Sequence, residues 1–276
     1  MRKRSFSIGA LSEIGYVKKT NQDRILIKIG EGQHGEFGIF VVADGMGGLA
    51  AGDRASEIVI KEFKAWWDNK LALIFNKKES VSINMIDKEL NSLIINVNKK
   101  VMEFGRGINS RVGTTLSMMF IHRNEYIIKH IGDSRIYKIN HEITRLTQDH
   151  SWIEQQIRSG CISKQEAVNH PQKHILLQCV GVKEVLDIFE TKGEISEEDK
   201  FLLCSDGFYN LLRKNEMLKA VGAYDKNNED VQEIVEELMG KVRIRGALDN
   251  ASAILICQDR HKQKLGLFGR LRYMIG

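Results

Sequence analysis

The sequence predicts an α+β fold: a central antiparallel β-sandwich flanked by α-helices in four layers, αββα, with a flap insertion. Three observations favour it. The expected elements run as strands, two helices, many strands, helices and a last strand, unlike the regular alternation of a doubly wound sheet. The chain has 276 residues, 42% of them hydrophobic, enough for one large core. One polar, helix-prone stretch, residues 147–182, interrupts the strand pattern.

The N-terminal strands are predicted from apolar runs and alternation. Residues 5–10 and 24–29 have strand character. The stretch 30–36 contains three glycines and turns the chain back into the apolar run 37–43. The segments on either side of this turn are therefore expected to pair as a hairpin.

Two helices are expected next. Apolar residues recur at helical spacing over residues 52–67 and again over 82–104. The stretch between them, 68–80, is polar and charged and is expected to be a connection. Each helix should pack on the sheet through its apolar face.

The second half of the chain is dominated by strands. From residue 112 to 146 the period drops to two, which predicts an antiparallel meander of three strands. The insertion over 147–182 contains the only proline, Pro171. It is either a lid or substrate-recognition element beside a catalytic face or a plain surface excursion. The elements expected after it are strands over 188–193 and 200–205, helices over 208–212 and 230–242, and a strand over 251–257.

Composition and charge exclude several classes of protein. No apolar stretch approaches the roughly 20 residues that span a bilayer, and the N-terminus lacks a signal peptide's hydrophobic region, so a cytoplasmic location is expected. The net charge is +5, but the basic residues are spread along the chain, which argues against nucleic-acid binding. The four cysteines have no paired spacing and are expected to be reduced.

Aspartates at the ends of predicted strands suggest one shared site. Asp44 follows the apolar run 37–43 and precedes glycines and a helix N-terminus, a suitable place for a cation and a phosphate. A lone Asp-Gly after a strand is usually only a turn. The arrangement recurs, however, at Asp133, Asp206 and Asp249.

The ligand chemistry of these residues favours Mg²⁺ or Mn²⁺. Carboxylates and a glycine carbonyl are hard oxygen ligands, and closely spaced carboxylates need cations to offset their repulsion. Asp44, if placed between two ions, would bridge them. Two such ions lower the pKa of a bound water and offset charge on a phosphate. The reaction expected of such a site is phosphomonoester hydrolysis without a covalent enzyme intermediate.

Seven short motifs follow one another along nearly the whole chain. They are Gly15 through Asn21-Gln22-Asp23, Asp44-Gly45-Met46-Gly47-Gly48, Gly113-Thr114-Thr115, Gly132-Asp133-Ser134-Arg135, Leu146-Thr147-Gln148-Asp149-His150-Ser151, Leu203-Cys204-Ser205-Asp206-Gly207 and Asp249-Asn250-Ala251-Ser252. In these motifs and their order the sequence resembles the metal-dependent protein phosphatase 2C (PPM) family, most closely its compact bacterial serine/threonine phosphatases. The family's β-sandwich with flanking helices agrees with the element order.

The resemblance implies roles for individual residues. The implied metal ligands are Asp23, Asp44, Gly45, Asp133, Asp206 and Asp249. Asp44 is expected to bridge two ions, with the Gly45 carbonyl on the second and Asp206 and Asp249 on the first; these three aspartates form the expected catalytic set.

Two acids have secondary roles in this scheme. Asp23 corresponds to an acid beside the second ion, acting through its water shell or as an orienting partner. Asp133 corresponds to an acid that joins Asp206 in holding a weaker third ion.

Two positions depart from the family pattern. Many members have arginine where Lys18 stands, so phosphate binding by Lys18 is expected through a point charge of weaker affinity, or is shared with Lys19. Eukaryotic members often have a histidine, a proposed general acid, where this chain has Met46. Methionine cannot donate a proton, so leaving-group protonation must come from metal-bound water or be dispensed with.

The main hypothesis is therefore a Mg²⁺- or Mn²⁺-dependent phosphatase in which a metal-activated water attacks phosphoserine and phosphothreonine of proteins, opposing a bacterial serine/threonine kinase. Its expected partners are phosphorylated proteins, the kinase and the kinase's targets. One alternative is a catalytically weak or inactive module that binds phosphoproteins, and another is a phosphatase for small metabolites. The complete acidic set argues against the inactive module.

The chain is expected to contain one catalytic domain, residues 1–260, with the flap over about 151–180. Residues 261–276 form a basic, amphipathic C-terminal tail beyond the family match. The tail is either a terminus that packs a few side chains or a segment that touches a membrane surface or a partner kinase.

Overall fold

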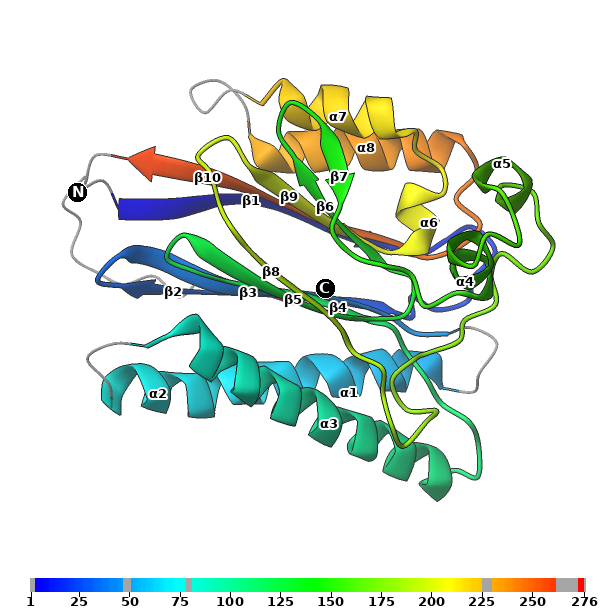
Figure 1. Ribbon diagram of the computed structural model, residues 1–276, viewed down its shortest axis with the longest axis horizontal. Helices are drawn as coiled ribbons and strands as arrows, with labels where there is room; N and C mark the ends of the chain where they lie inside the picture. Colours follow the sequence, from blue (N-terminus) through cyan, green and yellow to red (C-terminus); the bar gives the residue numbers. More distant parts are fainter. Residues whose placement is uncertain (1–2, 47–50, 78–80, 225–229, 262–272, 276) are drawn as a thin grey trace.

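The computed structural model describes residues 3–46, 51–77, 81–224, 230–261 and 273–275. Its strands lie in two layers, with helices on the outer face of each layer (Figure 1). This arrangement confirms the predicted α+β class. The two layers are joined into one curled sheet at a single point, where Arg4 of β1 pairs with Gly35 of β3.

The first layer places the first strand of the chain beside its last long strand. In spatial order it consists of β7 (Ile143–Arg145), β6 (Arg135–Ile139), β9 (Lys200–Cys204), β10 (Ala251–His261) and β1 (Lys3–Glu13). Strands β1 and β10 pair antiparallel along their whole length. The N-terminal strand is therefore held in place by the last long strand of the chain.

The second layer begins with the predicted hairpin. It consists of β11 (Tyr273–Ile275), β2 (Asp23–Gly32), β3 (Gly35–Asp44), β4 (Leu116–His122), β5 (Glu125–Ile131) and β8 (Phe189–Glu194). Strands β2 and β3 pair antiparallel, with Asp23 opposite Asp44. This register brings two of the predicted metal ligands to the same end of the hairpin.

The predicted three-stranded meander is wrong at its third strand. Strands β4 and β5 form an antiparallel hairpin as expected, but β6 pairs with β7 and β9 in the other layer. The chain changes layer at Gly132, whose φ of 114° is in the region that favours glycine. Alternation identifies a strand, but it does not identify the strand's neighbour.

The first helical stretch is longer than predicted. Helix α1 (Gly52–Ala65) continues through a π-helical segment (Trp66–Leu71) into α2 (Ala72–Lys77), so the expected connection over 68–80 is largely wrong. The segment remains helical because Trp67 and Leu71 are buried, with the Trp67 ring 5.4 Å from that of Phe37. Helix α3 (Ile83–Gly107) agrees closely with the second predicted helix.

Five shorter or later helices complete the described fold. They are α4 (Trp152–Arg158), α5 (Lys164–Ala167), α6 (Asp206–Tyr209), α7 (Lys214–Gly222) and α8 (Val231–Ile244). Helix α7 was not predicted. Its N-terminus is capped by Glu216, whose carboxylate accepts a hydrogen bond from the backbone N–H of Arg213. Helices α7 and α8 cover the first layer, whereas α1, α2 and α3 cover the second (Figure 1).

The packing of β3 on both of its faces explains why its sequence is a continuous apolar run. Ile39, Val41 and Ala43 pack into the core shared with α1 and α3. Phe40 and Val42 point the other way, into the core between the two strand layers. Because both faces of the strand are covered, every residue of its centre is apolar, and the acid at its end marks the edge of the core.

Most of the predicted tail, 261–276, lies outside the described residues, as do Gly47 and Gly48 of the predicted site. The described part returns to the second layer, where β11 pairs antiparallel with β2 and Met274 stands opposite Ile27. Within the described residues, no helix has the length and apolar character needed to cross a bilayer. Three cysteines are buried, Cys161 is exposed, and all four are free thiols, as predicted.

We expect His122 to make the protein less stable in mild acid. Burial lowers the pKa of His122 to about 4, against about 6.5 in the unfolded chain. As the pH falls, the unfolded state takes up this proton before the folded state does. The free energy of unfolding is therefore unaffected by His122 above about pH 6.5 and falls between about pH 6.5 and pH 4, by at most about 1.4 kcal/mol per pH unit. His122→Phe keeps a ring beside Phe37 and Phe75 and should reduce this loss.

Urea unfolding of the wild type and His122→Phe at pH 7.5 and pH 5 measures the effect as a difference between the two proteins. Comparing the two cancels the contributions of other titrating groups. Equal losses in both proteins would contradict the assignment to His122.

Candidate active site

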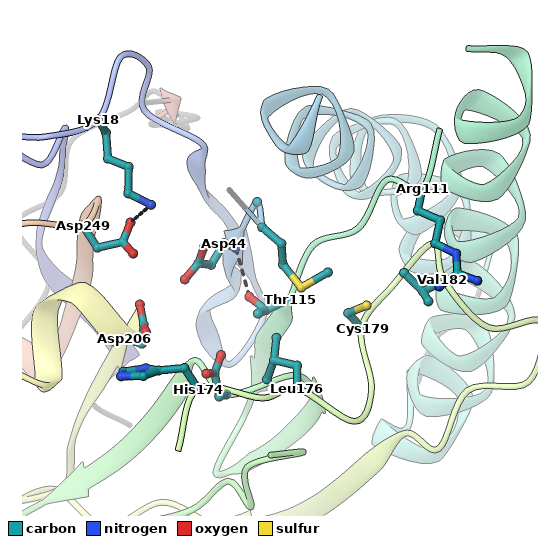
Figure 2. A pocket seen from close by; sticks show the side chains of 13 residues that line it. Lys18, Asp44, Arg111, Thr115, His174, Leu176, Cys179, Val182, Asp206 and Asp249 are labelled. Carbon is teal, nitrogen blue, oxygen red and sulfur yellow. Dashed lines mark hydrogen bonds and ion pairs between the residues drawn. The ribbon is translucent and has the colours of Figure 1, made fainter. Parts of the chain in front are cut away.

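Four aspartates from different strands line one cavity of about 550 Å³. Asp44 ends β3, Asp133 follows β5, Asp206 follows β9 and begins α6, and Asp249 precedes β10. Figure 2 shows the carboxylates of Asp44, Asp206 and Asp249 directed into the same space. The structure therefore brings together the strand-end acids that the sequence singled out.

The backbone around Asp44 is held by hydrogen bonds to a neighbouring segment. Its N–H donates to Thr115 Oγ1 at 2.9 Å, and its carbonyl accepts from the Thr115 N–H at 2.8 Å. The N–H of Gly45 donates to the Gln22 carbonyl at 3.1 Å. A Cβ at Gly45 would lie only 2.3 Å from the Gly52 carbonyl oxygen, so glycine is required here for close packing.

Asp23 is buried behind the cavity and does not line it. Its Oδ2 accepts hydrogen bonds from the hydroxyls of Ser205 and Ser252, both at 2.7 Å, which ties β2 to the other strand layer. Its Oδ1 is buried and has no hydrogen-bond partner among the residues that the structure describes. Burial, with smaller contributions from Asp206 and Asp249, raises the pKa of Asp23 to about 6 despite the two serines.

The acids around the cavity repel one another in their ionised forms. Burial first, and then the neighbouring carboxylates, raise the pKa values of Asp44 and Asp133 well above their usual range. Burial and the charge of Asp249 raise the pKa of Asp206 in the same direction. A divalent cation would relieve this repulsion and could also satisfy the unpaired Oδ1 of Asp23, directly or through water.

This donor set fits a hard cation such as Mg²⁺ or Mn²⁺, because it consists of carboxylate oxygens with no thiolate among them. Among the described residues, no three acidic, histidine or cysteine side chains are gathered closely enough to hold an ion as they stand. Binding would therefore draw the carboxylates inward. The driving force for that movement would be the cation's attraction for the carboxylates, which offsets the repulsion between them.

Lys18 lies on the loop after β1, at the edge of the same cavity. Its Nζ is 2.6 Å from Asp249 Oδ1 (Figure 2). Burial lowers the pKa of Lys18, but the hydrogen bond and the charge of Asp249 outweigh this and raise it overall. The predicted phosphate ligand is thus close to the acids and is itself paired with one of them.

Sequence reasoning missed three cavity-lining side chains that carry a titratable group: Arg111, His174 and Cys179. No motif or periodic pattern in the sequence singles out Arg111 or His174. Arg111 lies in the segment before β4, and His174 lies in the insertion. Burial raises the pKa of the Cys179 thiol to about 11, so it is protonated and unreactive at neutral pH.

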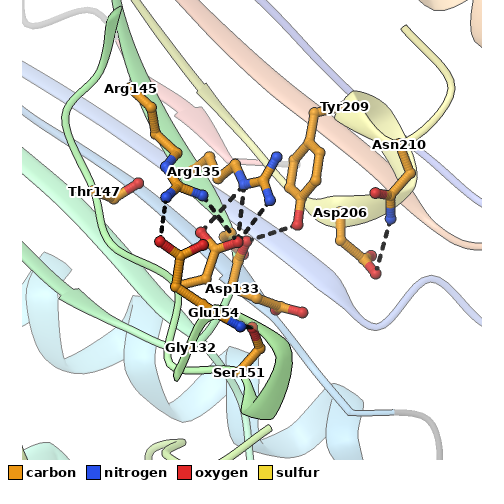
Figure 3. Close-up of polar contacts among 12 residues, drawn as sticks. Gly132, Asp133, Arg135, Arg145, Thr147, Ser151, Glu154, Asp206, Tyr209 and Asn210 are labelled. Atoms are coloured by element: carbon orange, nitrogen blue, oxygen red, sulfur yellow. Dashed lines mark hydrogen bonds and ion pairs between the residues drawn. The ribbon is translucent and has the colours of Figure 1, made fainter. Parts of the chain in front are cut away.

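An ion pair between Arg135 and the buried carboxylate of Asp149 supports the Asp133 loop (Figure 3). Arg135 donates to both carboxylate oxygens of Asp149, with Nη2 at 2.6 Å from Oδ2 and Nε at 3.1 Å from each oxygen. The guanidinium lies 3.9 Å above the Tyr209 ring, whose hydroxyl donates to the Asp133 carbonyl at 3.0 Å. Arg135 and Asp149 occur in the recognised motifs, whereas Tyr209 does not, and the structural role of all three was not predicted.

The insertion lies beside the acids. Its residues His174 and Leu176 line the cavity, and Val180, near its C-terminal end, exchanges two backbone hydrogen bonds with Thr114, at 2.9 and 3.1 Å. Thr114 also donates its hydroxyl to the Asp44 carbonyl at 2.9 Å. The C-terminal end of the insertion is therefore anchored next to the central acid.

Aspartates gathered at strand ends around one cavity are typical of hydrolases that use metal ions. The family model for protein phosphatase 2C matches residues 16–243. The chain is 32% identical over 222 residues to "Serine/threonine phosphatase stp" of Listeria monocytogenes serotype 4b, covering 80% of this chain and 84% of that protein. The chain therefore belongs to the protein phosphatase 2C family.

Solved structures agree with this assignment. The S. agalactiae serine/threonine phosphatase has a TM-score of 0.78 at 27% identity, covering 92% of this chain and 99% of that chain. The catalytic domain of serine/threonine protein phosphatase PstP in complex with two manganese ions shares the fold, with a TM-score of 0.73 at 24% identity, and covers 93% and 99% of the two chains.

Proposed function

We propose that this chain, a serine/threonine phosphatase of the protein phosphatase 2C family, hydrolyses phosphoserine and phosphothreonine in proteins with two Mg²⁺ or Mn²⁺ ions and a weaker third. The observation that carries the proposal is the convergence of four strand-end aspartates on one cavity. The PstP domain in complex with manganese, which has the same fold, supports the choice of cation.

The residues that would hold the ions are those named from the sequence. Asp44 would bridge the pair, with the Gly45 carbonyl on one ion and Asp206 and Asp249 on the other. When bound, the two ions supply a water of lowered pKa and offset the charge of the phosphate under attack.

The two remaining acids differ in their surroundings. Asp133, which faces the cavity, would join Asp206 in holding the third ion. Asp23, which is buried behind the cavity, would act as an orienting partner or through a water molecule.

The protein's own groups would hold and enclose the substrate. Thr115 fixes the backbone of Asp44, so the central carboxylate has a defined position. Lys18 would bind the phosphate by charge. Met46 lines the cavity where eukaryotic members often place a histidine, and the methionine side chain at this position cannot protonate the leaving group.

The finer features of the fold belong to the same proposal. The two strand layers would form a β-sandwich within four layers, αββα, and residues 151–180 would act as the flap. The arrangement in Figure 1 and the hydrogen bonds between Val180 and Thr114 support both assignments. The alternative, an inactive phosphoprotein-binding module, is not favoured because the whole acidic set is retained.

The direct test is release of phosphate from a phosphothreonine peptide with and without Mn²⁺. Hydrolysis should require the ion and should be faster for the peptide than for a sugar phosphate. Faster turnover of the sugar phosphate would contradict a protein substrate, and no hydrolysis by the folded, Mn²⁺-supplied protein would contradict the enzyme itself.

Changing Lys18 should affect substrate binding more than turnover. Loss of a charge-assisted contact to phosphate in Lys18→Ala should raise KM about 10-fold with a smaller change in kcat. Lys18→Arg should lower KM, since a guanidinium binds two phosphate oxygens at once. Lys19→Ala is the matched control. An equal rise in KM for Lys19→Ala would show that the two lysines share the role.

An opposing serine/threonine kinase, a cytoplasmic location, a catalytic domain ending near residue 260 and membrane contact through the tail 261–276 remain predictions from the sequence. Deleting residues 261–276 tests the last of these. An unchanged cellular distribution of the truncated protein would contradict membrane contact.

A further inference from the structure

Exposed apolar side chains gather on two loops beside the candidate active site. Ile14, Tyr16 and Val17 follow β1, whereas Ile244 and Leu248 lie at and just after the end of α8. All five side chains are between 48% and 87% exposed. They are five of the eleven large apolar side chains that are exposed in the described part of the chain. We call these five residues the apolar rim.

The two loops of the apolar rim are joined to each other. The Tyr16 N–H donates to the Ala247 carbonyl at 2.7 Å, and Arg243 pairs with Glu13 at 2.7 Å. A Cβ at Gly15 would lie 2.4 Å from the Asp249 carbonyl oxygen, so the loops pack backbone against backbone. The apolar rim is therefore one surface held in place by its own backbone contacts.

The apolar rim is continuous with the acids of the candidate active site. Val17 precedes Lys18, Leu248 precedes Asp249, and the Lys18 ammonium pairs with the Asp249 carboxylate. Leu248 also lines a second cavity, of about 750 Å³, that extends along the insertion. Four residues line both cavities: Asp133, His174, Asp206 and Asp249.

We propose that the apolar rim binds the polypeptide of the phosphoprotein substrate and selects an apolar side chain close to the phosphorylated residue. The proposal rests on the proposed function. A phosphate held near Lys18 and the acids would bring the neighbouring residues of its polypeptide over Val17 and Leu248. Clustered apolar side chains exposed to water are typical of a binding surface, whereas scattered ones are not.

The test compares three substrates in Mn²⁺: a phosphothreonine peptide with leucines flanking the phosphorylated residue, the same peptide with serines there, and 4-nitrophenyl phosphate. Burial of one apolar side chain predicts a kcat/KM about 10-fold higher for the leucine peptide. Leu248→Ser and Ile244→Ser should each remove most of that preference. Hydrolysis of 4-nitrophenyl phosphate should stay the same, because this small ester does not reach the apolar rim.

Leu73→Ser is the matched control, since Leu73 is also an exposed leucine but belongs to α2, at the opposite end of the molecule from α4 and α5 (Figure 1). It should leave the preference intact. No hydrolysis of any substrate by the wild type would overturn the proposed function, and hydrolysis of all three without a preference would overturn the apolar rim alone.

Two further outcomes would also overturn the proposal. Loss of peptide and 4-nitrophenyl phosphate activity in equal measure in both rim variants would indicate damage to the site instead of lost selection. Sedimentation that shows a wild-type dimer, converted to monomer by Leu248→Ser, would assign the apolar rim to a second copy of the chain.

Discussion

Replacing Asp44 or Asp206 by asparagine should nearly abolish metal-dependent phosphate release and at the same time make the metal-free protein harder to unfold. Both carboxylates lie in a cavity where burial and neighbouring acids raise their pKa values, so their ionised forms destabilise the folded state at neutral pH. Asparagine keeps the shape and removes the charge. The metal-free variants should therefore unfold at a higher temperature than the wild type.

The same substitutions should reverse the order of stability when Mn²⁺ is added. The wild type should gain stability, since an ion that binds only the folded state raises its unfolding temperature. The variants should gain little. Loss of a residue that only hydrogen-bonds to a metal ligand lowers activity by roughly 10–100-fold. Loss of a ligand itself, as in these variants, should lower activity by more.

Calorimetric unfolding with and without Mn²⁺, together with phosphate release, measures both effects on the same samples. Glu103→Gln on the exposed face of α3 removes a charge that lines neither cavity and is the control for charge alone. Equal stabilisation of the wild type and both variants by Mn²⁺ would falsify the assignment of these aspartates as ligands.

Of the substitutions proposed for this protein, Arg135→Met should lower the free energy of unfolding the most. The substitution leaves the Asp149 carboxylate, which is only 5% exposed, with the longer 3.3 Å contact to Arg145 as its one ion pair within the described part of the chain. Breaking a buried pair by removing one partner costs about 3–5 kcal/mol. Because Arg135 also packs on Tyr209, which holds the Asp133 carbonyl, weaker binding of a third ion should accompany the loss.

Urea unfolding gives the free energy, and two comparisons interpret it. Arg135→Met combined with Asp149→Leu removes both charges and should cost less than Arg135→Met alone. Arg243→Met breaks a pair on the surface with Glu13 and should cost at most about 1 kcal/mol. A cost for Arg135→Met no greater than that for Arg243→Met would show that the buried pair is not important for stability.

The sequence by itself determined the strand-end positions of the acids. An apolar run that is buried on both faces can end only where the core ends, and a charged residue such as Asp44 marks that point. The same logic applies to Asp133, Asp206 and Asp249. Because these positions depend on local sequence alone, the four acids that line the cavity could be named in advance, whereas Arg111, His174 and Cys179 could not.

The tertiary structure decided which elements are neighbours. Local periodicity could not show that β6 leaves β5 and joins β9, since a strand pairs with whichever edge the core offers it. The helical continuation through Trp67 has the same cause, because burial against Phe37 overrides the polar character of the stretch.

Contacts between distant segments were also beyond the sequence. The pair formed by Lys18 and Asp249 and the grouping of Val17 with Leu248 join residues more than 200 positions apart. No local pattern encodes such distances. The sequence thus named the residues to which we assign the chemistry, whereas long-range packing decided how they are oriented and which surface lies beside them.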